Sequence, residues 1–349
     1  MKKRILLISD VKGWGGWVRG EYIKKYLSDE FEFDLIDDNE FGQYEIKSNQ
    51  NYFSKDDVKK YIKLKELSPN GQIDFGEFVK FHLETRLQND YDLFYFLFHT
   101  MLVKKGVKRF LNGNNKVITI VTGNPVIKEC FYNKKNGREG VNNFLKLSNK
   151  CQAVGANNLF SLNELKNVYD GTTFYAPRGV DPDVFRPEKE FEEKKDFVVA
   201  YVGKPVYQKG LPDYIRPACE MAGVKLIIND RNYTDALPPD EMNKFYNQAD
   251  AYIVASTIDG TPNPALEAAS CGKPVIANMI GNMPELIEDG VNGFLVDMNV
   301  NSYVNKINQL KEDRKKCYEM GMNARQTILK DWTWEKVTEN EREIFRRVL

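Results

Sequence analysis

Residues 256–297 read STIDGTPNPALEAASCGKPVIANMIGNMPELIEDGVNGFLVD and follow an apolar run, 251–255, that is typical of a buried parallel strand. The segment 259–264 is dense in turn-forming residues, and the Ala-rich segment 265–270 is a good helix former. The next strand is expected at 273–277. A tight turn between a buried strand and a helix offers an anion free N–H groups and the positive end of the helix dipole. The pattern predicts an α/β fold with a site for a phosphorylated ligand.

The same turn carries two acidic residues at a defined spacing. Asp259 and Glu267 are separated by the seven residues GTPNPAL, and the pattern continues as LEAASCGKPVIA and GNMPELI. It strongly resembles the retaining glycosyltransferases of family 4. The resemblance implies that Glu267 binds the ribose of a nucleotide sugar and that Asp259, where the family usually has Glu, faces the sugar. It also implies donor binding by Gly260, Thr261, Pro262, Asn263 and Leu266. The alternative is that Glu267 only caps a surface helix.

Composition limits the class of protein. With 349 residues the chain is too long for one ordinary core, so two domains are expected. The 50 basic and 50 acidic residues cancel, so no overall charge favours nucleic acid or an anionic membrane. Five scattered cysteines without a C-x-x-C pair predict reduced thiols, and only two histidines are present, which excludes a His-rich metal site.

Neither a membrane span nor a secretory leader is evident in the sequence. No apolar run approaches the roughly 20 residues that span a bilayer. The basic N-terminus is followed by only four strongly apolar residues, ILLI, which is too short for a signal-peptide core. We therefore expect a cytoplasmic protein, with a peripheral position at a membrane as the alternative.

A glycine-rich segment, 11–20, follows the first expected strand, 4–10. An amphipathic helix is expected next, with these residues on its inner side: Val18, Tyr22, Ile23, Tyr26 and Leu27. Strand, glycine-rich loop and helix form a nucleotide-binding type of arrangement, although the G-x-G-x-x-G spacing is absent. The family resemblance implies that Gly15 and Gly16 face the donor phosphates and the acceptor. A flexible turn without a ligand is the alternative.

His99 follows directly on the strongly apolar segment 91–98, which we expect to be a strand. Open parallel sheets place their ligand sites at the carboxyl ends of their strands. The resemblance implies that His99 lines the acceptor pocket, and it joins Asp259 and Lys209 as a candidate catalytic residue. A neutral histidine in the core or at a helix cap is an equally good interpretation.

Two lysines follow the first expected strand of the second domain, 197–202. Lys204 and Lys209 occupy positions where the family carries an Arg/Lys pair that grips the donor diphosphate, although a lysine lacks the bidentate fork of arginine. The resemblance therefore implies donor binding by both lysines. Ordinary solvated loop lysines are the alternative.

Residues 178–187, RGVDPDVFRP, resemble the hinge between the two domains of the family, with Arg178 where Asn is common. The segment Asp181-Pro182-Asp183 has the form of the metal-binding D-x-D motif of the other glycosyltransferase fold. Because it lies in an interdomain connection, we interpret it as part of the hinge.

These observations predict an α/β chain of the GT-B type, with two Rossmann-like domains facing each other across a cleft. We assign 1–185 to an acceptor-side domain and 186–331 to a domain that binds the nucleotide sugar. A last helix, 332–349, is expected to pack back onto the first domain, with Trp332 and Trp334 as anchors.

The expected function is transfer of a sugar from a nucleotide sugar, with a UDP-sugar as the expected donor, to an acceptor hydroxyl with retention at the anomeric carbon. No metal and no further cofactor are expected, because the two lysines and a helix N-terminus serve the diphosphate. The acceptor stays open between a saccharide, a lipid-linked saccharide, a small molecule, a protein and a modified nucleic-acid base. The basic stretch 55–65 is compatible with several of these. A nucleotide-sugar epimerase and a non-catalytic nucleotide-sugar-binding protein are the alternative functions.

Overall fold

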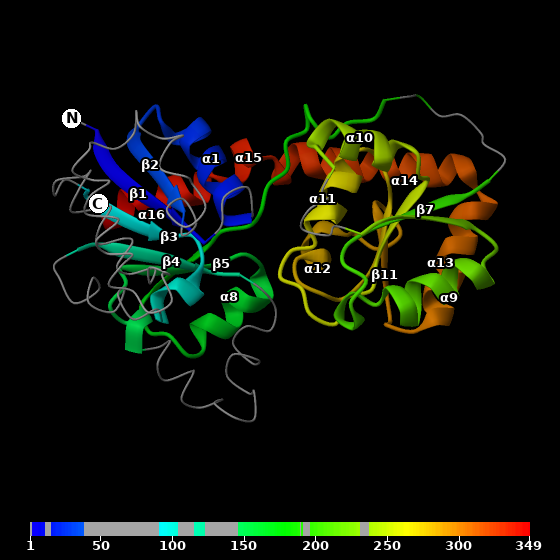
Figure 1. Ribbon diagram of the computed structural model, residues 1–349, viewed down its shortest axis with the longest axis horizontal. Helices are drawn as coiled ribbons and strands as arrows, with labels where there is room; N and C mark the ends of the chain where they lie inside the picture. Colours follow the sequence, from blue (N-terminus) through cyan, green and yellow to red (C-terminus); the bar gives the residue numbers. More distant parts are fainter. Residues whose placement is uncertain are drawn as a thin grey trace, which may run out of the picture.

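The computed structural model describes residues 2–10, 15–37, 91–103, 115–122, 146–188, 190, 196–230 and 237–349. They form two α/β domains, each built on a parallel sheet, that lie side by side in Figure 1. The predicted pair of Rossmann-like domains is confirmed. The basic stretch 55–65 lies outside the described residues.

The first domain contains a six-stranded sheet in the order β2-β1-β3-β4-β5-β6. The strands are β1 (Lys3–Ser9), β2 (Phe31–Asp37), β3 (Leu93–Phe96), β4 (Val117–Val121), β5 (Ala153–Ala156) and β6 (Thr172–Tyr175). The described helices are α1 (Gly15–Leu27) and α8 (Leu159–Lys166), with a 3₁₀ turn over His99–Val103. β1 and β3 coincide with the strands predicted from the sequence at 4–10 and 91–98, although β3 is shorter than expected.

Alternation of side chains places a core on each face of this sheet. In β1, Leu6 and Ile8 pack with Leu162 of α8 on one face. Ile5 and Leu7 pack with Ile23 of α1 on the other face. Since successive side chains of a strand point to opposite sides, a run that is apolar at every position requires cover on both faces.

The second domain contains a five-stranded sheet in the order β11-β10-β9-β7-β8. Its strands are β7 (Val198–Val202), β8 (Lys225–Asn229), β9 (Ala251–Val254), β10 (Val275–Asn278) and β11 (Gly293–Val296). Its helices are α9 (Arg216–Met221), α10 (Pro239–Asn247), α11 (Asn263–Ser270), α12 (Met283–Leu286), α13 (Val300–Glu312) and α14 (Arg314–Thr327). Residues of α10, α11 and α12 share one core with β7, and residues of α9, α13 and α14 share the core on the opposite face.

The chain returns from the second domain to the first through 328–334. Trp332 packs in the core of the second domain, whereas Trp334 stacks on Tyr22 of α1 with ring centroids 4.8 Å apart. The return runs beside the outgoing connection, because Val180 N–H donates to the Trp332 carbonyl at 2.9 Å and Trp334 N–H donates to the Val180 carbonyl at 3.3 Å. Helices α15 (Trp334–Val337) and α16 (Glu339–Val348) then lie with the first domain (Figure 1).

A buried ion pair joins α16 to α1. Arg19 and Glu341 are in direct contact, and their side chains are 5% and 0% exposed. The Arg19 guanidinium also donates to the carbonyls of Ala176 and Pro177 at 2.7 and 2.8 Å. Arg19 is buried, although the residues predicted for the inner side of this helix did not include it. The helix also begins earlier than predicted, at Gly15, which lies inside the predicted loop 11–20.

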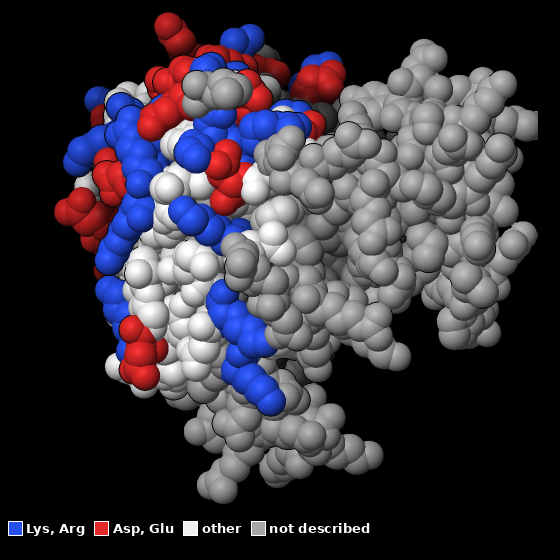
Figure 2. Space-filling model, turned by 90° about the vertical axis from the view of Figure 1, so that its left-hand side faces the viewer, with Lys and Arg blue, Asp and Glu red and all other residues white. Residues whose placement is uncertain are grey.

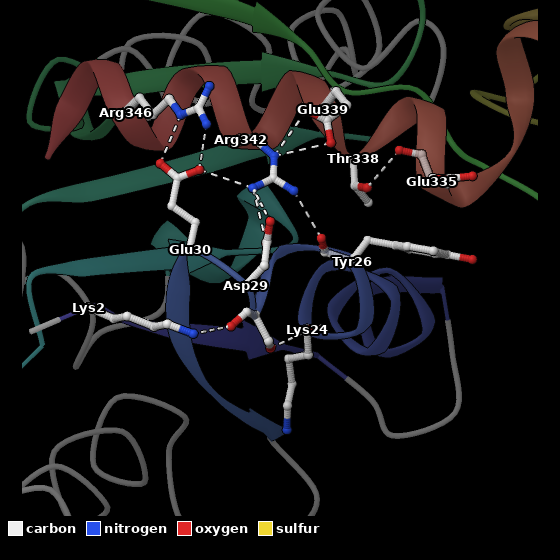
Figure 3. A network of polar contacts seen from close by, with 11 residues as sticks. Lys2, Lys24, Tyr26, Asp29, Glu30, Glu335, Thr338, Glu339, Arg342 and Arg346 are labelled. Atoms are coloured by element: carbon white, nitrogen blue, oxygen red, sulfur yellow. Dashed lines mark hydrogen bonds and ion pairs between the residues drawn. The ribbon is translucent and has the colours of Figure 1, made fainter.

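A second set of charges joins α16 to the end of α1 at the surface (Figure 3). Arg342 Nη1 lies 3.1 Å from an Asp29 oxygen and 3.0 Å from a Glu30 oxygen, and Arg346 contacts the same Glu30 carboxylate at 2.6 Å. Hydrogen bonds from Arg346 and Arg342 lower the pKa of Glu30 to about 2. Two guanidinium groups therefore hold one carboxylate in its ionised form.

Charges of both signs are mixed on the left-hand face of the molecule, as Figure 2 shows, in agreement with the zero net charge of the sequence. None of the helices in the described ranges has the length and apolar character needed to cross a bilayer. Cys151, Cys219, Cys271 and Cys317 are free and buried.

Glu30→Gln should make the protein less stable at neutral pH but not in strong acid. Because the pKa of Glu30 in the fold lies below its ordinary value of 4.5, its contribution is present above that pH and is lost as the pH falls toward 2. We expect the melting temperature to drop by about 1–3 °C at pH 7 and the difference to vanish near pH 2.

The matched control is Glu319→Gln, whose carboxylate is exposed and lies 4.0 Å from a single lysine, Lys315. This control should shift the melting temperature little at any pH. A difference between Glu30→Gln and the wild type that persists unchanged from pH 7 to pH 2 would contradict the proposed charge pairing.

Candidate active site

The loops that follow β7 and β9 lie next to each other because these strands are neighbours in the sheet. Thr257 N–H donates to the Gln208 carbonyl at 2.9 Å, which joins the two loops. Gly210 has φ 65°, and a Cβ on it would overlap the Ala255 carbonyl oxygen. A glycine is therefore required where the loop after β7 turns against the end of β9.

Lys209 and Asp259, assigned above to the donor diphosphate and to the sugar, form an ion pair with each other. Their side chains are 33% and 14% exposed, so the pair is accessible from one side. Each charge is neutralised by its partner, and the contact fixes the two loops relative to one another. The structure thus brings together two predicted site residues that are 50 positions apart in the chain.

Tyr201 supports the other predicted lysine. Its hydroxyl donates to the Lys204 carbonyl at 3.1 Å, which holds the backbone of the loop after β7. Burial, with a contribution from the nearby Asp259 carboxylate, raises the pKa of Tyr201 to about 12. Tyr201 therefore stays protonated and acts as a hydrogen-bond donor at neutral pH.

Helix α11 begins at Asn263, directly after the turn, and buries its inner side in the domain core. Leu266, predicted to bind the donor, is 1% exposed and belongs to that core. Glu267 lies on the partly exposed side, and its Oε2 accepts a hydrogen bond from the Tyr246 hydroxyl at 2.6 Å. Tyr246 comes from α10, is fully buried and was not identified from the sequence. It orients the carboxylate predicted to bind ribose.

Three asparagine side chains near this turn contain buried polar atoms without a hydrogen-bond partner in the described protein. They are Oδ1 of Asn263, Oδ1 of Asn278 and both amide atoms of Asn282. Asn282 is 0% exposed and follows Gly281, where a Cβ would lie 2.5 Å from the Gly260 carbonyl oxygen. Burying an unpaired amide costs about 1–3 kcal/mol, so such groups are unusual outside functional sites.

The first domain contacts the same turn. Asn158 Nδ2 donates to the Gly260 carbonyl at 3.0 Å, and Asn157 Nδ2 donates to the Thr261 hydroxyl at 3.2 Å. Both asparagines follow β5, just as the turn follows β9. The carboxyl ends of strands from the two sheets therefore meet at the predicted donor-binding segment, of which Pro262 is the last residue before α11.

Gly15 and Gly16 lie in the first turn of α1, beside the interdomain connection. The Gly15 carbonyl accepts a hydrogen bond from Arg178 at 2.8 Å, and a Cβ on Gly16 would lie 2.9 Å from the Ser9 hydroxyl. Arg178, noted above as a departure from the family pattern, also lies over the Trp334 ring, 5.5 Å from its centroid. It thus links the connection to the glycines. Their contact with a donor stays a prediction.

His99 follows β3, as predicted, but it is only 5% exposed. Burial lowers its pKa to about 4, and a hydrogen bond with the backbone of Ile120 opposes this shift. The imidazole is therefore neutral at pH 7, which matches the alternative of a core histidine. Its role at an acceptor pocket stays a prediction.

The Asp181-Pro182-Asp183 segment holds the interdomain connection against α1. Asp181 accepts a hydrogen bond from the Tyr22 hydroxyl at 3.0 Å and lies 3.8 Å from Lys25. In the described part of the chain, no three His, Cys, Asp or Glu side chains are grouped as they would be around a metal ion. Independence from metal stays a prediction.

Gly210→Ala should destabilise the protein more than Gly290→Ala. Both glycines have left-handed backbone, at φ 65° and 78°, but nothing lies within 4 Å of a Cβ on Gly290. The control should cost about 1 kcal/mol, and Gly210→Ala should cost at least twice that because the loop must also move. Urea unfolding measures both. Equal losses would show that the loop after β7 does not pack tightly on Ala255.

Comparisons with known proteins agree with this geometry. Residues 216–327, which include the turn and α11, match the family model described as "Glycosyl transferases group 1". The alpha-maltose-1-phosphate synthase of Mycolicibacterium smegmatis is 26% identical over 121 residues, which are 33% of this chain and 31% of that protein. The chain thus matches about a third of the length of this curated relative.

Solved structures also resemble the whole chain, and two of them serve as examples. The sucrose-phosphate synthase from Thermosynechococcus elongatus has a TM-score of 0.74 at 15% identity and covers 99% of both chains. HepE from Anabaena, solved in complex with UDP-glucose, has a TM-score of 0.69 at 18% identity and covers 99% of both chains. The chain has the GT-B fold of these proteins, and its segment 216–327 is similar to the group 1 glycosyl transferases.

Proposed function

We propose that this protein is a glycosyltransferase that moves a sugar from a nucleotide sugar to an acceptor hydroxyl with retention at the anomeric carbon. One observation carries the proposal: the Lys209–Asp259 pair, the start of α11 and Glu267, which is held by Tyr246, come together at the turn between β9 and α11. That turn lies in the segment 216–327, which is similar to group 1 glycosyl transferases. Charges of both signs at one strand end suit a ligand that combines a diphosphate with hydroxyl-rich rings.

The nucleotide would be held by the second domain. Glu267 accepts hydrogen bonds from the ribose hydroxyls, while Lys204, Lys209 and backbone N–H groups near Thr261–Asn263 bind the diphosphate. Lys209 keeps its contact with Asp259 in this arrangement, since an ammonium group has three donors. UDP is the proposed nucleotide, because UDP-glucose is the ligand of the similar HepE structure.

The sugar would lie against Asp259 and the buried asparagine side chains. Sugar hydroxyls are donors as well as acceptors, and the unpaired Oδ1 of Asn263 is an acceptor at the start of α11. Such hydrogen bonds would be made in a buried setting, where they contribute most.

The proposed chemistry is a front-face substitution. The acceptor oxygen forms a bond to the anomeric carbon as the bond from that carbon to the diphosphate oxygen breaks, and the departing phosphate takes the acceptor proton. Lys204, Lys209 and backbone N–H groups stabilise the negative charge that develops on the leaving group. The acceptor would approach from the side of the first domain, near Gly15, Gly16 and His99.

Incubation with UDP-, GDP- and ADP-sugars tests this proposal through slow hydrolysis of the donor. We expect release of the nucleotide from one donor class, an α-configured sugar product from an α-configured donor by NMR before it mutarotates, and little change with excess chelator. Asp259→Asn serves as the control and should lower kcat while nucleotide binding is retained.

Inversion of the sugar would overturn retention, and activity lost with chelator and restored by manganese would overturn independence from metal. Binding of a nucleotide sugar without any turnover would favour the non-catalytic alternative.

Glu267→Ala should weaken binding of UDP about 10- to 100-fold, because hydrogen bonds to a charged group contribute about 1.5–3 kcal/mol each. Tyr246→Phe should weaken it about 5-fold, since the carboxylate stays but loses the hydroxyl that orients it. Calorimetric titration measures both.

Tyr303→Phe is a matched control, because the buried Tyr303 hydroxyl donates to the Val254 carbonyl at 2.9 Å and also has a hydrogen bond with the backbone of Asn278, so the variant loses a buried hydroxyl that does not contact Glu267. This control should leave UDP affinity unchanged. The wild type should bind 2′-deoxy-UDP more weakly than UDP, by most of the loss in affinity that Glu267→Ala causes for UDP. If the wild type and Glu267→Ala bind both ligands with equal affinity, Glu267 is not the ribose ligand.

A further inference from the structure

The turn after β5 in the first domain is bound to the turn after β9 by the buried side chains of Asn157 and Asn158. Asn158 is 0% exposed, donates to the Gly260 carbonyl through Nδ2 and caps α8 through Oδ1, which accepts from Ser161 N–H at 2.7 Å. Because both ends of the amide are used, its orientation is fixed. Asn157 adds the hydrogen bond to the Thr261 hydroxyl.

A second contact between the domains lies at the end of β6, the strand next to β5. Glu285 of α12 accepts a hydrogen bond from Leu159 N–H at 2.7 Å with one carboxylate oxygen and from the Tyr175 hydroxyl with the other. The carboxylate thus sits at the N-terminus of α8, where a negative charge is favourable. Glu285, Leu159 N–H and the Tyr175 hydroxyl thus form a contact between the domains that is shielded from water, and burial there raises the pKa of Glu285.

The two contacts act on one segment. Asn158 holds Gly260, which lies between Asp259 and the start of α11, and Glu285 holds the loop after β10, whose Gly281 packs against that same Gly260 carbonyl. Two separate attachment points, on neighbouring strands, fix both the position and the orientation of the first domain relative to this turn.

We infer that Asn158 and Glu285 are positioning residues: by closing the first domain onto the turn 259–263, they hold its backbone in the shape that the sugar-transfer step needs. The inference rests on the proposed function for its catalytic part. The side chains proposed to hold the nucleotide, Glu267, Lys204 and Lys209, all lie in the second domain and outside the turn 259–263, so loss of the two positioning residues lowers kcat much more than it lowers the affinity for UDP. A contact that merely stabilised the domain packing would lower stability without separating these two quantities.

The test uses Asn158→Asp, which keeps the capping oxygen of α8 but has no N–H group for the Gly260 carbonyl. Glu285→Gln leaves one acceptor oxygen for two donors. The matched control is Asn299→Asp: Asn299 caps α13 in the same way, accepting from Ser302 N–H at 3.0 Å, and lies away from the domain contact. Each variant is measured for hydrolysis of UDP-glucose, for UDP affinity and for hydrogen exchange of residues 257–266.

For Asn158→Asp and Glu285→Gln we expect a loss in kcat of about tenfold, a UDP Kd within twofold of the wild type and faster exchange over 257–266. The control should match the wild type in all three. Unchanged kcat and exchange would overturn the inference, as would kcat and UDP affinity that fall together. If the wild type hydrolyses no nucleotide sugar, the proposed function is wrong. Hydrogen exchange over 257–266 then decides by itself whether Asn158 and Glu285 hold the turn.

Discussion

Parallel pairing of the strands is the constraint on which the rest of the structure depends. Every described strand pair in both sheets is parallel, so the carboxyl ends of all strands in a sheet leave it at one edge. Groups that are far apart in the chain are thereby collected at two edges. Lys209, Asp259 and Glu285 follow three strands of one sheet, and Asn158 and Tyr175 come from the ends of two strands of the other. Contact between the edges makes one site out of both.

The buried Arg19–Glu341 pair decides where the last helix lies. Removing two charges from water is costly, and this pair is held by hydrogen bonds of Arg19 to two backbone carbonyls at the start of the interdomain connection. Arg19 of α1 therefore binds both the interdomain connection and α16 through one guanidinium group. An apolar contact would hold α16 against the sheet, but it would not select one rotation and one register so narrowly.

Several of the strands and helices that carry this site could be predicted from the sequence. Apolar runs located β1, β3, β7, β9 and β10, and the turn 259–264 with its flanking residues located the N-terminus of α11, because local backbone preferences suffice for both. The sequence also placed Lys209 and Asp259 in one site, although their mutual contact depends on the order β9-β7-β8, which no single segment encodes.

Three contributions could not be predicted from the sequence, and each depends on tertiary packing. Tyr246 has the appearance of an ordinary inward-facing aromatic residue, and only the approach of α10 to α11 brings its hydroxyl to Glu267. Arg19 breaks the apolar side of its helix, and its partner lies more than 300 residues later. The helix boundary at Gly15 lies inside the predicted loop, and close contacts with Arg178 and Ser9 leave little room for side chains at Gly15 and Gly16.

The return of α16 to the first domain has a consequence for the order in which the molecule is built. Ile344 and Phe345 of α16 belong to the same core as Ile5 and Leu7 of β1, so this core is completed only after every described strand of the second domain has been synthesised. The second domain lies between β1 and α16 in the chain, and all of its described strands precede α16. The second domain can therefore fold during synthesis while the face of the first sheet that α16 covers is still exposed.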